Sequence, residues 1–185
     1  LEKARRPGRF HGILYLLWGL IFAKLFLVEY GTQVYDVPVN TGLYVWTLTL
    51  AMGVVCSVVY LLMTRQNTPK RPLTNRVVLS IWVSAFVGMA IVGIAGILLS
   101  DLNAYLVPGV FAVILGIAYF IHGMMNGRQL FRVVGGLWWL CSIWLFAYAD
   151  VSALLSFGIF LILFQVVPTA WMQFSRSNPP APDAA

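Results

Sequence analysis

Charged side chains are scarce in this chain of 185 residues: only 10% of them are Asp, Glu, Lys or Arg, while 61% are hydrophobic. A soluble domain carries about 25% charged residues, so this chain lacks the polar surface that a water-soluble fold needs. The hydrophobic residues come in continuous runs of about 20, the length with which a helix crosses a bilayer. The composition therefore predicts an integral membrane protein.

Cysteine and acidic residues are also rare. Cys56 and Cys141 are the only cysteines, and both fall inside hydrophobic runs, which excludes a disulfide framework. No Asp or Glu lies deep in a run, which argues against a proton-driven pump. HExxH, CxxC and GxSxG motifs are absent, and His11 lies too near the predicted membrane surface to pair with His122 around a haem. We therefore expect no enzyme, no metal and no cofactor.

Six hydrophobic segments are present, and none alternates with polar residues as a β-barrel strand does. They predict an all-α integral membrane protein, a bundle of six transmembrane helices paired into three antiparallel hairpins. The predicted domain organisation is a basic N-terminal arm (1–9), a transmembrane domain (10–174) and a disordered tail (175–185). The predicted spans are Phe10 to Val28, Leu43 to Thr64, Val77 to Ser100, Ala104 to Met125, Phe131 to Tyr148, and Val151 to Phe174.

Basic residues follow alternate connections. All twelve Lys and Arg except Lys24 lie in the N-terminal arm, the second and fourth connections, or the tail. By the positive-inside rule, both termini face the cytoplasm. We expect this basic face to contact anionic lipid headgroups, not nucleic acid. Of the outer connections, only "EYGTQVYDVPVNTG" is long enough to carry structure. Short connections without an N-glycosylation acceptor favour a bacterial inner membrane.

Lys24 is the one basic residue more than two residues inside a predicted span. It lies about 22 Å along the helix from Arg9, several ångströms short of the outer surface of a hydrocarbon core of about 30 Å. A lysine can extend its ammonium group to the headgroups from this depth. Alternatively, Lys24 faces the bundle interior and binds an anionic group, or pairs with Asp101 or Asp150.

Four tryptophans lie near the middle of their spans, although membrane tryptophans favour the interfaces. An indole N–H at that depth needs a hydrogen-bond acceptor. These side chains either pack against glycine-rich neighbours or, together with Lys24, line a pocket for an apolar or flat ligand. They are Trp18, Trp138, Trp139 and Trp144.

Several polar side chains occupy similar depths in the cytoplasmic halves of the spans. Within a helix they share faces through i+3 and i+4 spacing. Faces that point inward would form a polar vestibule open to the cytoplasm, and faces that point outward would form an interfacial belt. The residues are His11, Tyr15, Tyr60, Tyr119, His122 and Asn126.

Small residues recur at helical spacing in the third and fourth spans. Such stripes allow the backbone of another helix to approach closely, within one chain or between the two chains of a homodimer. Pro168 lies inside the sixth span and is expected to bend it and to free a carbonyl close to Gln165. The predicted packing residues are Ser80, Ser84, Gly88, Gly109, Gly116 and Gly123.

These features favour a non-enzymatic accessory or regulatory subunit of a membrane complex. The alternative is a small-molecule binding or transport component, with the tryptophans as its pocket and the first outer connection as a lid. In length and topology the layout resembles two kinds of small bacterial six-helix protein: the substrate-binding component of energy-coupling-factor vitamin transporters and the acid-resistance inner-membrane family. No motif of either family can be matched residue by residue.

Overall fold

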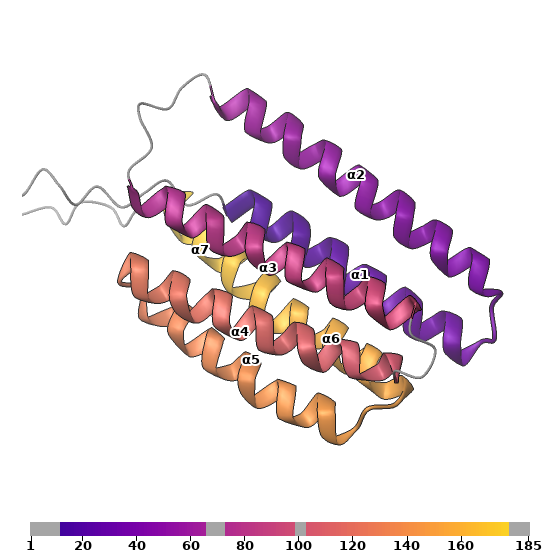
Figure 1. Ribbon diagram of the computed structural model, residues 1–185. Coiled ribbons are helices and arrows are strands. Elements are labelled where there is room, and N and C mark those ends of the chain that lie inside the picture. Colours follow the sequence, from indigo (N-terminus) through magenta and orange to yellow (C-terminus); the bar gives the residue numbers. More distant parts are fainter. Residues whose placement is uncertain (1–11, 66–72, 99–102, 178–185) are drawn as a thin grey trace, which may run out of the picture.

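The computed structural model describes residues 12–65, 73–98 and 103–177, and helices make up almost all of them (Figure 1). No described residue belongs to a strand. A 3₁₀ turn, η2 (Ala104–Leu106), precedes α4, and a π-helical turn, η3 (Ile162–Val166), joins α6 to α7. The helices are α1 (Gly12–Val34), α2 (Val39–Arg65), α3 (Leu73–Leu98), α4 (Val107–Asn126), α5 (Gln129–Ala147), α6 (Val151–Leu161) and α7 (Val167–Ser177).

Six helical stretches of the described chain are long and apolar enough to cross a membrane. This confirms the predicted all-helical membrane protein with six candidate spans. The last span is continuous through α6, η3 and α7. The predicted N-terminal arm lies outside the described residues, and α7 extends to Ser177, three residues into the predicted tail.

The first connection is shorter than the sequence indicated. Helix α1 continues to Val34, and α2 begins at Val39, so only residues 35–38 separate them. The last turns of α1 are supported by a hydrogen bond from Thr32 Oγ1 to the Glu29 carbonyl at 2.8 Å. Asp36 then turns the chain with a left-handed φ of 52°. A connection of this length cannot act as the lid that the binding-component hypothesis requires.

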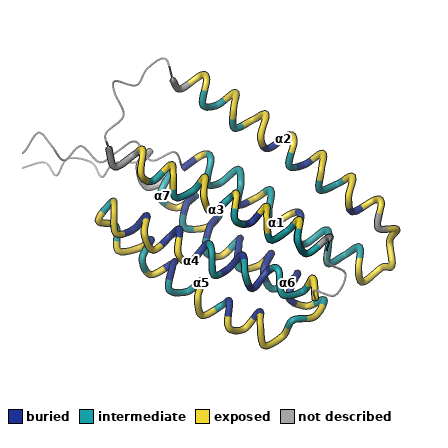
Figure 2. The backbone as a smooth tube through the Cα atoms, viewed as in Figure 1, coloured by how far each residue is buried: buried dark blue, intermediate teal, exposed yellow. Residues whose placement is uncertain are grey.

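Helix α4 lies at the centre of the packing. It packs most extensively against α5 and also contacts α3 and α6, while α1 packs mainly against α6 and α2. Figure 2 shows buried residues concentrated in α4 and on the facing sides of its neighbours, whereas α2 is largely exposed. Helix α2 is therefore an outer helix, attached to the bundle chiefly through α1.

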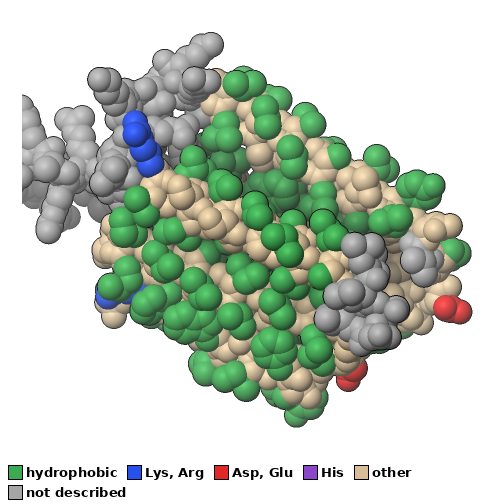
Figure 3. Space-filling view, viewed as in Figure 1, with side chains coloured by type: hydrophobic (Ala, Val, Ile, Leu, Met, Phe, Trp, Pro, Cys, Tyr) green, Lys and Arg blue, Asp and Glu red, His purple; other side chains and the backbone are tan. Residues whose placement is uncertain are grey.

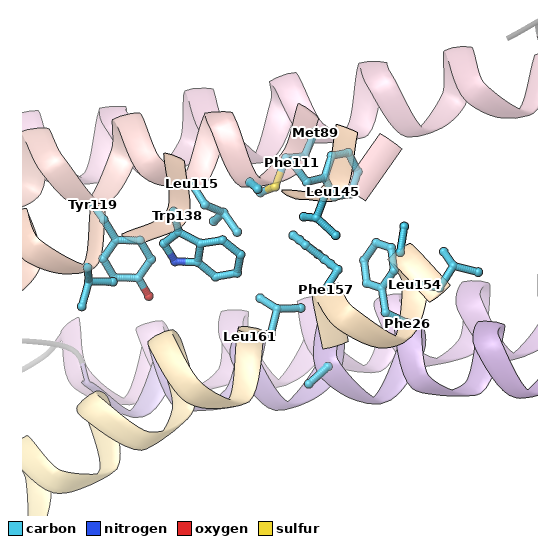
Figure 4. Packing of buried hydrophobic residues seen from close by; sticks show 14 of the residues in the cluster. Phe26, Met89, Phe111, Leu115, Tyr119, Trp138, Leu145, Leu154, Phe157 and Leu161 are labelled. Carbon is cyan, nitrogen blue, oxygen red and sulfur yellow. The ribbon is translucent and has the colours of Figure 1, made fainter. Parts of the chain in front are cut away.

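Aromatic rings fill the core between these helices (Figure 4). Phe157 of α6 lies edge-on to Phe26 of α1, with ring centroids 4.6 Å apart, and 5.5 Å from Trp138 of α5. Phe111 of α4 completes the cluster at 6.2 Å from Phe157. Because lipid tails are as apolar as these rings, close packing rather than the exclusion of water holds the helices together here.

The α4–α5 contact brings two backbones together. A Cβ atom added to Gly135 would lie 2.8 Å from the Gly116 carbonyl oxygen, and one added to Gly123 would lie 2.7 Å from the backbone nitrogen of Arg132. Gly109 approaches the ring of Phe146 in the same way. The glycines predicted to pack in the fourth span thus lie against α5.

The third span differs from its prediction. Gly88 faces Ile114 of α4, but Ser80 and Ser84 are exposed, and the Ser80 hydroxyl donates to the Arg76 carbonyl of its own helix. The i+4 spacing was read correctly, but Ser80 and Ser84 lie on the part of the α3 surface that no described helix covers. They do not act in packing within the described chain.

The surface of the bundle is hydrophobic along its sides. Figure 3 shows charged side chains only near the two ends of the visible face, with Lys and Arg at one end and Asp and Glu at the other. This distribution fits helices that cross a hydrocarbon layer with their polar ends at its two surfaces.

Asp150 caps the N-terminus of α6. Its carboxylate accepts from the Ser152 backbone N–H at 2.7 Å. Hydrogen bonds from the Ser152 side chain and then its backbone lower the pKa of the Asp150 carboxyl below its usual value. A carboxyl with a lowered pKa stabilises the fold at neutral pH, and this contribution is lost as the pH falls below about 4 and through the folded-state pKa.

We therefore expect Asp150→Ala to lower the melting temperature at pH 7, and the difference from the wild type to shrink at about pH 3. Asp150→Asn keeps a capping oxygen but not the charge, so it should lose part of the stability at pH 7 and differ less from the wild type at about pH 3. Thermal unfolding in detergent at the two pH values measures both variants. A loss that is equally large at acid pH would contradict an ionised cap.

Candidate functional site

A buried histidine joins three helices. The Nδ1 atom of His122 on α4 lies 3.0 Å from the Tyr15 hydroxyl of α1 and 3.2 Å from Trp82 Nε1 of α3. An indole N–H can only donate, so Nδ1 is the acceptor, and this pattern assigns the remaining ring proton to Nε2 of a neutral imidazole. His122 is 3% exposed. We call Tyr15, Trp82 and His122 the polar junction.

Aromatic rings enclose the polar junction. Phe131 of α5 lies 4.5 Å from the His122 ring, and Trp82 meets both Tyr15 and Tyr119 edge-on, at 4.8 and 5.1 Å. In such surroundings water does not compete for the hydrogen bonds, so each is stronger than at a surface. An unpaired group there is correspondingly costly.

A π-helical turn adds a fourth segment to this region. Pro168 has no N–H, so it cannot donate to the carbonyl four residues back as an α-helical residue does. Just before it, the Val167 N–H donates to the Ile162 carbonyl, five residues back, which is the π-helical pattern. Inside this turn, the buried side chain of Gln165 donates to the Tyr15 carbonyl at 3.2 Å. Gly19 leaves the space for it, since a Cβ there would lie 3.0 Å from Gln165 Cγ. The π-helical turn thus lies where Pro168 predicts a disturbed helix, and it points the Gln165 side-chain amide into the bundle.

Three buried polar atoms in the described chain have no hydrogen-bond partner. They are the Tyr119 hydroxyl, Trp138 Nε1 and Arg132 Nε. Figure 4 shows the first two turned toward one another within the core. Each such group lowers the free energy of unfolding by on the order of 1–3 kcal/mol relative to a hydrogen-bonded one. The residues at the centre of the bundle are therefore not those that would give the highest stability.

A small cavity lies beside the polar junction. Its volume is about 10 Å³, roughly what one water molecule requires. Rings from α1, α3, α4 and α6 surround it, and its two lining residues with polar side-chain atoms, Trp82 and Gln165, already donate to His122 and to the Tyr15 carbonyl. The lining includes Phe22, Trp82, Phe86, Phe111, Phe157 and Gln165.

The predicted aromatic pocket is not formed by the residues assigned to it. Trp138 is fully buried, and Trp144 is 51% exposed. Trp139 is 36% exposed and packs against Gly116 and Phe120 of α4, while Trp18 donates to Ser57 of α2. Neighbouring residues on a helix point about 100° apart, so Trp138 and Trp139 cannot line one wall. None of the four tryptophans borders the cavity.

Lys24 lies on an exposed part of α1. It makes no hydrogen bond or ion pair with any described residue, and Asp150 instead caps its own helix. Asp101 lies outside the described residues. The arrangement matches a lysine that extends toward the membrane surface and gives no support to an anion site inside the bundle.

The residues predicted to form a vestibule separate into two groups. Tyr15, Tyr119 and His122 point inward and gather around Trp82, while Asn126 donates to the His122 carbonyl at 3.1 Å. Tyr60 is half-buried on α2, and His11 lies outside the described residues. Because rings cover His122, the inward group is an enclosed junction rather than an open vestibule.

Sequence reasoning did not assign Trp82 or Gln165 to the site. Trp82 falls in "SIWVS", at the same depth from its end of the span as Tyr15 and His122, and that shared depth was the available signal. For Gln165 the signal was its position three residues before Pro168, where the proline frees backbone groups.

Within the described residues, no group of three His, Cys, Asp or Glu side chains is placed to hold a metal ion. The junction offers a tightly held, neutral set of donors and acceptors. Comparisons with protein-family models, with curated proteins and with solved structures found no match to this chain.

Proposed function

We propose that this protein is a non-enzymatic accessory or regulatory subunit of a membrane complex, and that α2 is the helix its partner covers. The observation that carries the proposal is the attachment of α2 to the bundle chiefly through α1 (Figure 1). In this proposal both termini face the cytoplasm of a bacterial inner membrane, consistent with the basic connections and with the charge at the two ends of the bundle.

The inner face of α2 is fixed in place by specific contacts. Trp46 Nε1 donates to Glu29 Oε2 at 2.9 Å, and Ser57 accepts from Trp18 Nε1 at 3.0 Å. Gly53 lies against the side chain of Ile21 between these two contacts. A helix anchored at two depths in this way is presented to the bilayer in one orientation.

The opposite face of α2 is exposed and carries mostly small, apolar side chains. Thr47, Ala51 and Val55 follow one another at i+4 spacing and are exposed, with Leu48 beside them at 69% exposure. The Thr47 hydroxyl is satisfied by the Leu43 carbonyl at 2.8 Å. Small side chains let a second helix approach closely, which is how membrane helices gain packing energy. We call Thr47, Ala51 and Val55 the outer face of α2.

The binding-component alternative has less support. The cavity beside the polar junction holds about one water, the tryptophans assigned to a pocket diverge, and the first connection is too short for a lid.

A photo-crosslinking residue at Val55, introduced in the native host, tests the proposal. We expect one discrete polypeptide adduct, either a different membrane protein or a second copy of this chain. The same residue at Ile143, which is 67% exposed on α5, should give no discrete polypeptide adduct. Ala51→Trp should abolish the Val55 adduct while the protein still folds. Lipid adducts alone at both positions would overturn the proposal.

A further inference from the structure

Helices α2 and α3 lie along the same side of the bundle without packing extensively against each other. Figure 3 shows a hollow lined with hydrophobic side chains between them. We call this hollow the α2/α3 groove. On α2 it borders the outer face, because Val54 follows Ala51 by three residues and Thr47 by seven.

Trp18 of α1 forms the floor of the α2/α3 groove because it contacts both flanking helices. Its Nε1 donates to Ser57 Oγ of α2 at 3.0 Å, and its ring lies 5.0 Å from Phe86 of α3. The only polar atom of the indole is thereby satisfied, and the surface that it offers is apolar. Val54 and Val83, three residues before Ser57 and Phe86, are each about half exposed on the two walls.

One end of the α2/α3 groove carries an unpaired positive charge. Arg76 lies near the start of α3 and is exposed, and its side chain makes no hydrogen bond or ion pair with any described residue. Among the described residues, the acids Glu29, Asp36 and Asp150 lie near the end of α1, just after it, and just before α6, which is the end of the bundle away from the start of α3 (Figure 1). The groove therefore joins a cationic end to an apolar channel.

The length of the α2/α3 groove matches one leaflet. Phe86 follows Arg76 by ten residues, or about 15 Å of helix, which is half of a hydrocarbon core about 30 Å thick. A molecule with its charged group at Arg76 would reach the Trp18 floor near the bilayer midplane. A partner helix, by contrast, would continue through both leaflets and would gain nothing from the Arg76 charge.

We propose that the α2/α3 groove binds one anionic phospholipid, with its phosphate at Arg76 and an acyl chain passing Val83 to end on Trp18. Anionic lipids are abundant in the cytoplasmic leaflet, which is where the predicted orientation places Arg76. The lipid site does not depend on a partner subunit, because Arg76 and Val83 belong to α3 and Trp18 to α1; it shares with the proposed function only the cytoplasmic orientation of the termini.

Native mass spectrometry of the full chain in mild detergent, titrated with phosphatidylglycerol or phosphatidylcholine, tests the proposal. We expect one phosphatidylglycerol to bind at least tenfold more tightly than phosphatidylcholine. Arg76→Gln should remove this preference, whereas Arg76→Lys should keep most of it. Val83→Trp fills the groove and should weaken binding of both lipids, while Ile143→Trp on α5 should change neither.

Three results would overturn the lipid site. They are several equivalent lipids without preference for phosphatidylglycerol, unchanged selectivity in Arg76→Gln, or a polypeptide rather than lipid crosslinked from position 83. Arg76 is exposed, so its variants should fold, and they decide the question even if Val83→Trp does not. Loss of the Val55 adduct would bear on the proposed function alone.

Discussion

Replacing Gly135 with alanine is expected to destabilise the folded protein by about 3 kcal/mol, the upper range for overpacking a core. The added methyl group would lie 2.8 Å from both the Gly116 carbonyl oxygen and the Phe120 backbone nitrogen, and 3.0 Å from Phe120 Cα. These are backbone atoms of α4, so no side-chain rotation can relieve the contact. The two helices must separate instead, and other contacts along their interface weaken with them.

Gly136 provides a matched control for this substitution. A Cβ atom there meets nothing within 4 Å, and alanine favours the helix over glycine by up to about 1 kcal/mol. Gly136→Ala should therefore be neutral or slightly stabilising. Unfolding in mixed micelles of dodecyl maltoside and dodecyl sulfate, followed by circular dichroism, compares the two variants. Equal effects would contradict a backbone contact between α4 and α5.

The spans could be predicted from the sequence because bilayer thickness constrains them directly. Uninterrupted hydrophobic length is a local property, and the six predicted segments correspond to the six candidate spans of the structure. The first connection was predicted wrongly because "EYGTQV" is polar enough to resemble a loop. Helix α1 nevertheless continues through it, with Thr32 and Gln33 both bonded back to Glu29.

Which face of a span packs against another helix depends on the neighbouring helices, and the sequence does not reveal which helices are neighbours. The glycines of the fourth span lie against α5, whereas Ser80 and Ser84, with the same spacing, remain exposed on α3. The four tryptophans were grouped by depth alone. Depth correctly related Tyr15 to His122, but it could not separate Trp138, which is fully buried in the core, from Trp139, which packs at the edge of the α4–α5 contact.

Replacing His122 with leucine is expected to cost about 2–5 kcal/mol. The substitution removes Nδ1, which lies 3.0 Å from the Tyr15 hydroxyl and accepts from the Trp82 indole N–H at 3.2 Å. A buried donor left without a partner costs about 1–3 kcal/mol. The junction also ties α1 and α3 to α4, so its loss should loosen α3. Unfolding in mixed micelles measures the free-energy change.

Two tyrosine substitutions separate this hydrogen-bond effect from simple loss of packing. Tyr15→Phe removes a bonded hydroxyl and should cost about 1 kcal/mol, whereas Tyr119→Phe removes a buried hydroxyl without a partner and should be neutral or stabilising. In the His122→Leu background, Tyr15→Phe should cost less, because the hydrogen bond to Nδ1 is already absent there. If Tyr15→Phe costs the same in both backgrounds, the hydroxyl does not depend on His122. A cost for Tyr119→Phe equal to that of Tyr15→Phe would show that the Tyr119 hydroxyl is satisfied in the membrane.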